Sequence, residues 1–213
     1  MAAPNEILDE VLAAIAPHLA ENGYKKSARN FVGAGEGVMR VILFQTSQLK
    51  KPEEATFTLN VAVTSVAFHE AYSGKPFPKN AGSAEPVIQA GIGRFMPDGE
   101  AVWWSLNPNV SSALIASEVR EILDRSILPF LSRFKSETAL LTELEKGDAL
   151  PGFSAMRERC RAVLLAKNGR KDEAAKVLSA LVAANAAEGL EGFRASVNEL
   201  AGRLGVEAAA HGP

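Results

Sequence analysis

Several features that often point to a function are scarce or missing in this chain of 213 residues. Cysteine occurs once, as Cys160, so the chain forms no internal disulfide, and a reducing compartment such as the cytoplasm is expected. No stretch reaches the ~20 consecutive apolar residues of a membrane-spanning helix, so no membrane contact is predicted. The first ten residues, MAAPNEILDE, lack the basic and long apolar regions of a secretory signal. These absences favour a soluble cytoplasmic protein.

An excess of charge of either sign is also missing. The formal net charge is −2, so the composition gives no reason to expect nucleic acid or an acidic membrane surface as a partner. The most basic segment, residues 157–176, is interrupted by Glu158, Asp172 and Glu173 and has no aromatic side chains on which bases could stack. We interpret this segment as a solvent-exposed helix face, and nucleic-acid binding is not expected.

Motifs for catalysis and metal binding are absent as well. His18, His69 and His211 are far apart in the sequence and have none of the spacings found in metal sites. Cys160 lies among apolar positions of a predicted helix, where a thiol is usually buried and unreactive. We therefore predict no metal and no cofactor, and the sequence favours a protein that is not an enzyme.

The sequence does contain a strong strand pattern between Val38 and Thr64. Residues 56–64 alternate, with Phe57, Leu59, Val61 and Val63 on one side and mostly polar residues on the other. Residues 38–46 are apolar on both sides for most of their length, which is typical of a strand in the middle of a sheet. Together the two segments predict an antiparallel hairpin at the centre of a sheet.

Other strands and helices are predicted around this hairpin. Residues 29–32, 87–95 and 101–106 have strand patterns; in the last segment the core-facing residues are Val102, Trp104 and Leu106. Two helices complete the predicted domain, one before the strands and one after them. We predict an α+β fold in which an antiparallel sheet of four or five strands is packed by both helices on the face that carries Leu59.

The ends of these two helices are indicated by single residues. Asn5 is the predicted cap of the first helix, Pro17 predicts a kink or break within it, and Gly23 predicts its end. The second helix is expected to begin at Asn107-Pro108, with asparagine as the cap and proline in the first helical position.

The C-terminal part of the sequence is predicted to be entirely helical. Ser136 is the expected cap of one helix, and three alanine-rich helices follow, ending near Asn168, Ala187 and Leu204. Such helices have few large apolar residues to bury among themselves, so we expect them to dock on the sheet domain. The predicted division is a sheet domain over residues 1–134 and a helical extension over residues 135–213.

The longest segment without predicted secondary structure covers residues 65–86. It contains three prolines and two glycines: Pro76, Pro78, Pro86, Gly74 and Gly82. A loop of this length in a compact domain is usually functional or disordered. A surface excursion is one interpretation, and a lid over a ligand that uses Lys75 or Lys79 is the other.

Polar groups gather on the side of the predicted sheet opposite Leu59. They are Gln45, Thr58, Asn60, Arg94 and Trp103. Pairing of residues 87–95 with 101–106 brings Arg94 and Trp103 onto the same face, where the guanidinium can stack on the indole. Such groups on a rigid sheet suit a small anionic ligand or an acidic residue of a partner protein. The alternative is an ordinary solvated sheet face on which Trp103 covers the bare backbone of Gly91 and Gly93.

Several short motifs occur in the order found in a bacterial protein family, domain of unknown function 4304. They are Gly23-Tyr24-Lys25-Lys26, Phe31, Leu43-Phe44-Gln45-Thr46-Ser47, Phe57-Thr58-Leu59-Asn60-Val61-Ala62-Val63, Arg94 and Trp103-Trp104. The resemblance covers roughly residues 5–130, with Ala62 standing where the family has glycine. It implies an α+β domain and no established activity.

Two functions remain open at this point. The favoured one is a non-catalytic binding protein, an interaction module or immunity-type partner of another bacterial protein, because a polar sheet face is a platform for binding. The alternative is a small-ligand sensor or an enzyme with its site between that face and residues 65–86.

Overall fold

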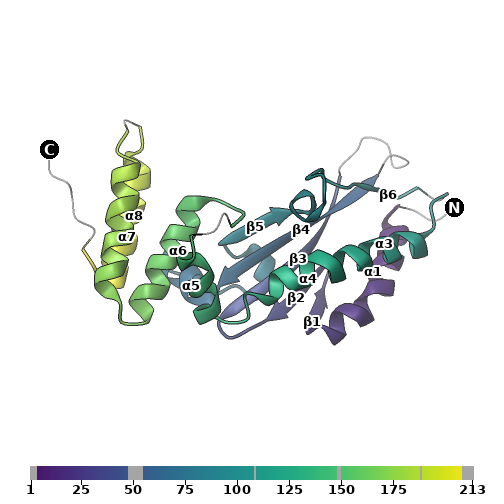
Figure 1. Cartoon of the computed structure of the whole chain (residues 1–213), viewed down its shortest axis with the longest axis horizontal. Coiled ribbons are helices and arrows are strands. Elements are labelled where there is room, and N and C mark those ends of the chain that lie inside the picture. The colour runs from purple at the N-terminus through teal and green to yellow at the C-terminus, as the bar shows by residue number, and fades with distance from the viewer. Residues whose placement is uncertain (1–3, 48–54, 108, 148–149, 188, 208–213) are drawn as a thin grey trace.

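The chain folds into a six-stranded antiparallel sheet with helices on one face and a group of helices at one end (Figure 1). The structure is a computed structural model and describes residues 4–47, 55–107, 109–147, 150–187 and 189–207. The strands are β1 (Tyr24–Ser27), β2 (Asn30–Ala34), β3 (Val38–Thr46), β4 (Thr56–Ser65), β5 (Ile88–Gly91) and β6 (Trp104–Ser105). The longer helices are α1 (Pro4–Glu21), α2 (Val66–Ser73), α3 (Ser112–Ile122), α4 (Leu128–Ser132), α5 (Glu137–Glu145), α6 (Ser154–Lys167), α7 (Lys171–Ala184) and α8 (Glu191–Leu204). Shorter turns are η2 (Ala81–Ser83), η3 (Ile92–Phe95) and the π-helical η4 (Leu123–Ile127).

The strand order is β1-β2-β3-β4-β5, and β6 also pairs with β4. The predicted α+β class and the central β3–β4 hairpin are therefore confirmed. Six strands form where four or five were predicted, partly because β1 and β2 make a hairpin in a region where one strand was expected. Ala28 turns this hairpin with a φ of 53°, a left-handed conformation.

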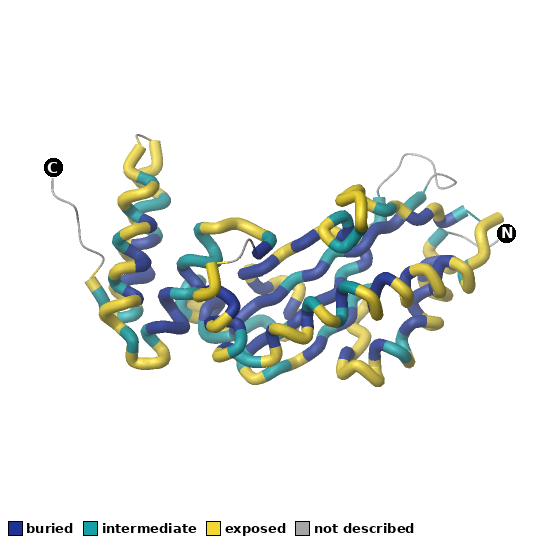
Figure 2. Tube along the Cα trace, viewed as in Figure 1, coloured by how far each residue is buried: buried dark blue, intermediate teal, exposed yellow. Residues whose placement is uncertain are grey.

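One face of the sheet is covered by α1, α3 and α4 (Figure 1). The strand residues on this face include Phe57, Leu59, Val61 and Val63, all with 0% exposure, as the alternation predicted. Figure 2 shows the corresponding pattern on the helices, which are buried on one side and exposed on the other. Burial of one face fixes the register, because a shift of one residue would turn these apolar side chains toward water.

The helix ends differ in part from the predictions. α1 ends at Glu21, and Gly23 follows with a φ of 81°, but Pro17 lies inside a single continuous helix. Asn5 lies within α1 and accepts a hydrogen bond from Arg29 through its side chain, so it is not the cap. α3 begins at Ser112 with Ser111 as its cap, and the start expected at Asn107 is wrong. Pro108, the predicted first residue of this helix, lies outside the described residues.

The π-helical η4 lies directly before α4, next to Pro129. Proline has no N–H to donate to the carbonyl four residues earlier, and its ring clashes with that carbonyl in an α-helix. The wider π turn relieves this clash, so α3, η4 and α4 form one continuous helical stretch across the sheet.

A helix occupies part of the segment predicted to lack secondary structure. α2 follows β4 directly, with the side chain of Ser65 accepting a hydrogen bond from the N–H of Phe68 at its start. Gly74 ends it in the left-handed conformation, with a φ of 68°. Residues 75–86 then return to β5. The sequence pattern did not predict this helix because the helix is short and its apolar stripe is narrow.

The C-terminal helices begin and end close to their predicted positions. Ser136 caps α5, and α6, α7 and α8 follow in the order expected. α6 contacts α2 and α5, and α8 contacts α2, while α7 and α8 lie at the end of the molecule opposite the N-terminus (Figure 1). The division into domains at residues 134 and 135 stays a prediction.

Candidate functional site

The sheet face opposite α1, which we call the open face, carries most of the residues predicted to form a site. Gln45 pairs with Thr58 and Leu43 with Asn60 in the register of β3 and β4, so the side chains of all four point to this face. Gln45 is exposed, Asn60 and Leu43 are half-buried, and Thr58 is buried. The predicted placement of Gln45, Thr58 and Asn60 on one face is confirmed.

Gln45 and Asn60 hold each other in place across the two strands. The amide nitrogen Nδ2 of Asn60 donates a hydrogen bond of 2.8 Å to Oε1 of Gln45. Each amide is therefore oriented before any ligand arrives, and each retains further donors or acceptors for one. Gly91 of β5 lies opposite Asn60, and the space beside it contains the Asn60 Oδ1 atom, 3.3 Å from where a Cβ would be.

Thr58 has a structural role that the sequence did not reveal. Its hydroxyl donates a hydrogen bond of 2.8 Å to the backbone carbonyl of Val102, and its exposed fraction is 6%. This bond fixes the segment before β6 onto the central strand β4. Thr58 is therefore placed to support the neighbouring residues more than to contact a ligand itself.

The predicted pairing of residues 87–95 with 101–106 is wrong. β5 ends at Gly91, and β5 and β6 each pair with β4 instead of with each other. Residues 92–103 leave the sheet between these two pairings, and we call this segment the edge lobe. The cause is the close approach of two backbones: the carbonyl oxygen of Gly99 lies 2.6 Å from where a Cβ of Gly93 would be. Only glycine permits this contact, which folds the lobe back on itself.

The edge lobe is also anchored to the helices. The ring of Phe95 meets the ring of Phe130 in α4 edge to face, with 5.3 Å between their centroids. Together with the bond from Thr58 to Val102, this contact ties the lobe at both ends. The lobe is therefore a fixed part of the surface next to the open face.

Arg94 and Trp103 belong to this lobe and not to paired strands. Arg94 lies in the last turn of η3 and is exposed, which corrects its predicted position on a sheet strand. Trp103 lies directly before β6 and has 48% of its surface exposed. Trp104, its neighbour, is 6% exposed and stacks on Phe57 with 5.1 Å between the ring centroids. The predicted frame, with Trp104 in the core and Trp103 outside, is confirmed.

Trp103 is not among the atoms nearest to a Cβ position at Gly91 or Gly93, the two glycines that we considered it to cover as an alternative. The nearest atoms to a Cβ at Gly93 belong to the backbone of residues 99–101, and the one atom within 4 Å of a Cβ at Gly91 belongs to Asn60. The exposure of Trp103 is thus not explained by packing on these glycines.

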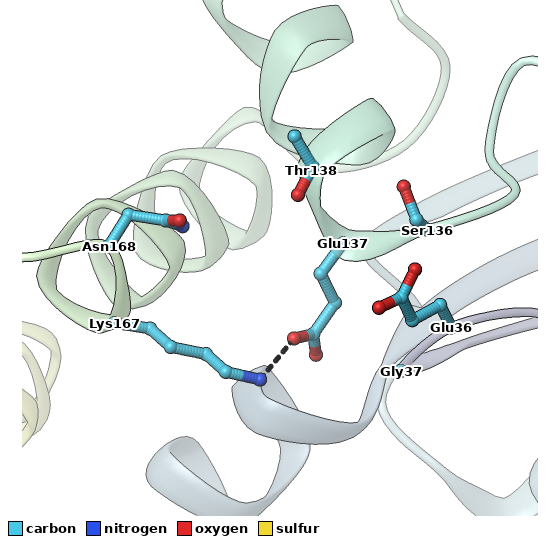
Figure 3. Close-up of a pocket in the computed structure, with 7 residues that line it drawn as sticks. All are labelled: Glu36, Gly37, Ser136, Glu137, Thr138, Lys167 and Asn168. Carbon is cyan, nitrogen blue, oxygen red and sulfur yellow. Dashed lines mark hydrogen bonds and ion pairs between the residues drawn. The ribbon is translucent and has the colours of Figure 1, made fainter.

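A second polar site, which the sequence did not suggest, lies where the sheet meets the C-terminal helices (Figure 3). It is a hollow of about 240 Å³ lined by Glu36, Gly37, Ser136, Glu137, Thr138, Lys167 and Asn168. In Figure 3, Lys167 from α6 and Glu137 from α5 reach toward each other, and their charged groups are 2.5 Å apart.

Both oxygens of the Glu137 carboxylate are engaged by groups of the protein. Its Oε1 atom accepts hydrogen bonds from the Ser65 hydroxyl at 2.7 Å and from the backbone N–H of Ala67 at 3.0 Å, while Oε2 pairs with Lys167. It also packs on Gly37, since a Cβ there would lie 2.7 Å from the Glu137 carboxyl carbon. We interpret this hollow as the junction that joins β4, α2, α5 and α6, and not as a ligand site.

The remaining candidates for chemistry are Cys160 and the three histidines. Burial, together with the nearby charge of Glu137, raises the pKa of the Cys160 thiol well above its ordinary value, so the thiol is unreactive. His69, which belongs to α2, is buried, and its ring meets the ring of Phe77 edge to face. His18 contacts Asp124 at 2.6 Å, and His211 lies outside the described residues. Among the residues that the structure describes, no three acidic, histidine or cysteine side chains come together as a metal site would require. Within the same residues, none of the helices combines the length and apolar character needed to cross a membrane.

Comparison with known proteins decides the family. A family model described as Domain of unknown function (DUF4304) matches residues 15–133, more than half of the chain. The chain belongs to the DUF4304 family. Comparisons with curated proteins and with solved structures gave no match.

The extent of the DUF4304 match separates the two polar sites. The open face and the edge lobe, with all five predicted site residues, lie within the matched segment. Glu137 and Lys167 lie beyond it, as do five of the seven residues that line the junction hollow, so most of this hollow belongs to the part of the chain outside the DUF4304 match. We therefore take the open face and the edge lobe as the candidate functional site of this DUF4304 chain.

Proposed function

We propose that this DUF4304 protein is a non-catalytic binding protein that recognises another protein through the open face and the edge lobe. The observation that carries the proposal is the half-exposed Trp103 on a lobe that is fixed to the sheet by Thr58 and to α4 by Phe95. Tryptophan and arginine are enriched in the energetic centres of protein interfaces. A fixed aromatic side chain loses little conformational freedom when it binds, so more of the contact energy appears as affinity.

The chemistry of the surface favours a partner with an acidic side chain next to an apolar one. Arg94 is an exposed cation in the same lobe as Trp103, and a guanidinium pairs well with a carboxylate. The amides of Gln45 and Asn60 add oriented hydrogen-bonding groups on the adjoining open face. Half-buried Leu43, which pairs with Asn60 and lies two residues before Gln45 on β3, supplies apolar surface. An interaction module or an immunity-type protein in the cytoplasm would use such a surface.

A comparison of capture by three baits tests the proposal. The intact chain, Trp103→Ala and Leu114→Ala are immobilised, and the proteins that each retains from a cell lysate are compared. Leu114 is a matched control because it is 57% exposed but lies on α3, away from the open face. We expect a partner that the intact chain and Leu114→Ala retain and that Trp103→Ala loses. Equal retention by all three baits would contradict the proposed surface.

The alternative, a small-ligand sensor or an enzyme, places its site between the open face and residues 65–86. One observation favours it: Thr64 on the open face donates a hydrogen bond of 2.9 Å to the backbone carbonyl of Glu85, so this segment does reach that face. A thermal-shift screen with nucleotides, sugar phosphates and amino acids separates the two functions. A shift that Arg94→Ala removes would favour the small-ligand function over protein recognition.

A further inference from the structure

Residues 75–86, which we call the strap, cross the open face between α2 and β5. At β4, the Thr64 hydroxyl is bonded to the carbonyl of Glu85. The strap forms η2 next to β3. At β2, a Cβ on Gly82 would lie 3.8 Å from the side-chain nitrogen Nδ2 of Asn30. Ala81 and Ala84 of the strap are both 8% exposed, so their methyl groups are buried.

The strap covers apolar surface on the open face. Val41 points to this face, since it pairs with Ala62, and yet it is only 1% exposed. Its neighbours on the same face, Val32 in β2 and Ala62 in β4, are half-buried. Lifting the strap would therefore add an apolar stripe to the polar surface formed by Gln45 and Asn60.

The strap is attached to α2, and both ends of α2 are held by side chains from the C-terminal helices. At its start, Glu137 of α5 accepts the N–H of Ala67. At its end, one guanidinium nitrogen of Arg203 in α8 donates to the carbonyls of Ala71, at 2.9 Å, and Tyr72, at 2.7 Å. The guanidinium of Arg159 in α6 lies over the Tyr72 ring at 5.4 Å. A helix of eight residues has little stability of its own, so these contacts add to the cap at Ser65 in holding α2 in place.

We propose that the C-terminal helices regulate the open face by holding α2, and through it the strap, over the apolar stripe. The inference rests on the proposed binding function for its biological meaning, but the coupling itself is a property of the chain alone. Release of Arg203 from the end of α2 loosens the strap and uncovers Val41. A partner that engages the open face then gains apolar contact area, so partner binding and release of α8 favour each other.

The test measures access to position 41 by thiol labelling of the full chain. Val41→Cys introduces a thiol under the strap, and native Cys160 gives little background because it is fully buried with a raised pKa. The labelling rate is compared in three backgrounds: native, Arg203→Ala and Arg194→Ala. Arg194 is a matched control because it is also on α8 and also donates to two carbonyls, those of Asn185 and Ala187, which are not in α2.

We expect Arg203→Ala to raise the labelling rate about fivefold and Arg194→Ala to leave it unchanged. Hydrogen exchange should report the same loss of protection in α2 for Arg203→Ala alone. Equal rates in the Arg203→Ala and Arg194→Ala backgrounds would overturn the proposal, as would rapid labelling in the native background. If Arg203→Ala does not fold, Thr64→Val replaces it: this change removes the bond to Glu85 and should raise labelling without altering α2.

Because no partner is present in these measurements, their failure is distinct from failure of the proposed function. A capture experiment then tests whether the loosening of the strap affects partner binding. With the strap loosened by Arg203→Ala, more partner should be retained than by the native chain, and Trp103→Ala should still abolish retention. Increased labelling without increased retention would overturn the regulatory part of the proposal and leave the binding surface intact.

Discussion

The hydroxyl of Ser65 and the carboxylate of Glu137 are joined by a buried hydrogen bond of 2.7 Å, although the residues are 72 positions apart in the sequence. The same carboxylate accepts the N–H of Ala67 and pairs with Lys167. Through one side chain, the last residue of β4 and the first turn of α2 are connected to α5 and α6. This junction is one of the contacts that attach the helices outside the DUF4304 match to the sheet.

Replacement of Glu137 should therefore be costly. Glu137→Ala leaves the Ser65 hydroxyl and the Ala67 N–H without their acceptor, and we expect the free energy of unfolding to fall by about 2–4 kcal/mol. Chemical denaturation of both proteins measures this change. Glu121→Ala is the control, because Glu121 makes an exposed pair with Arg125 and should have little effect. Similar losses for the two variants would contradict the role of the junction.

The two adjacent tryptophans should respond in opposite ways. Trp104→Ala removes a buried ring that stacks on Phe57 and donates to Glu118, and we expect a loss of about 3–5 kcal/mol in unfolding free energy. Trp103→Ala should change stability little and lower partner affinity by more than about 1 kcal/mol. Thermal melts and binding titrations provide the two measurements. A loss of stability in Trp103→Ala without a loss of binding would make Trp103 a packing residue.

Neighbouring positions on β4 should differ because they lie on opposite faces. Leu59→Ala truncates a side chain with no exposed surface, so we expect a cost of about 2–5 kcal/mol. Thr58→Ala removes one hydrogen bond to Val102 and should cost about 1 kcal/mol. Equilibrium denaturation separates the two values, and equal losses would argue against the observed register.

Stability should decrease in acid through Glu143. Burial pushes the pKa of this carboxyl upward, but hydrogen bonds from Lys146 and Arg133 and the charges of both outweigh burial, so its pKa is lowered. A carboxyl with a lowered pKa in the folded state adds stability above its ordinary pKa and loses that stability as the pH falls through the folded value.

We therefore expect Glu143→Gln to be less stable than the native chain at neutral pH and to lose less stability on acidification. Melting temperatures of both proteins, recorded from neutral pH to well below the ordinary glutamate pKa, test this. Parallel curves for the two proteins would show that Glu143 does not contribute to the acid response.

Truncation before Pro151 tests the predicted docking of the helical extension. The shortened chain lacks Lys167, Arg159 and Arg203, and it uncovers the parts of α2 and α5 that α6 contacts. We expect a lower melting temperature and lower solubility. If the truncated chain stays soluble and melts at the same temperature as the full chain, the helices form an independent domain.

The sequence alone determined the centre of the fold and one side of the candidate site. The alternation in residues 56–64 set the buried face of β4, and the same period applied to residues 102–106 placed Trp104 inside and Trp103 outside. Ser136 and the alanine-rich segments set the helices α5 to α8. These features depend on period, capping and composition, which are local properties that a sequence displays directly.

Only the tertiary structure determined the conformations of residues 65–86 and 92–103. Both segments lack a clear period, and α2 is stabilised by groups up to 132 positions away, such as Arg203. The edge lobe depends on the approach of Gly99 to Gly93 and on the bond from Thr58 to Val102. For this reason Arg94 lies in η3 and not in the predicted strand. A buried glutamate such as Glu137 has no sequence signature. Contacts between distant segments compete with local preference, and only the folded chain shows which contacts form.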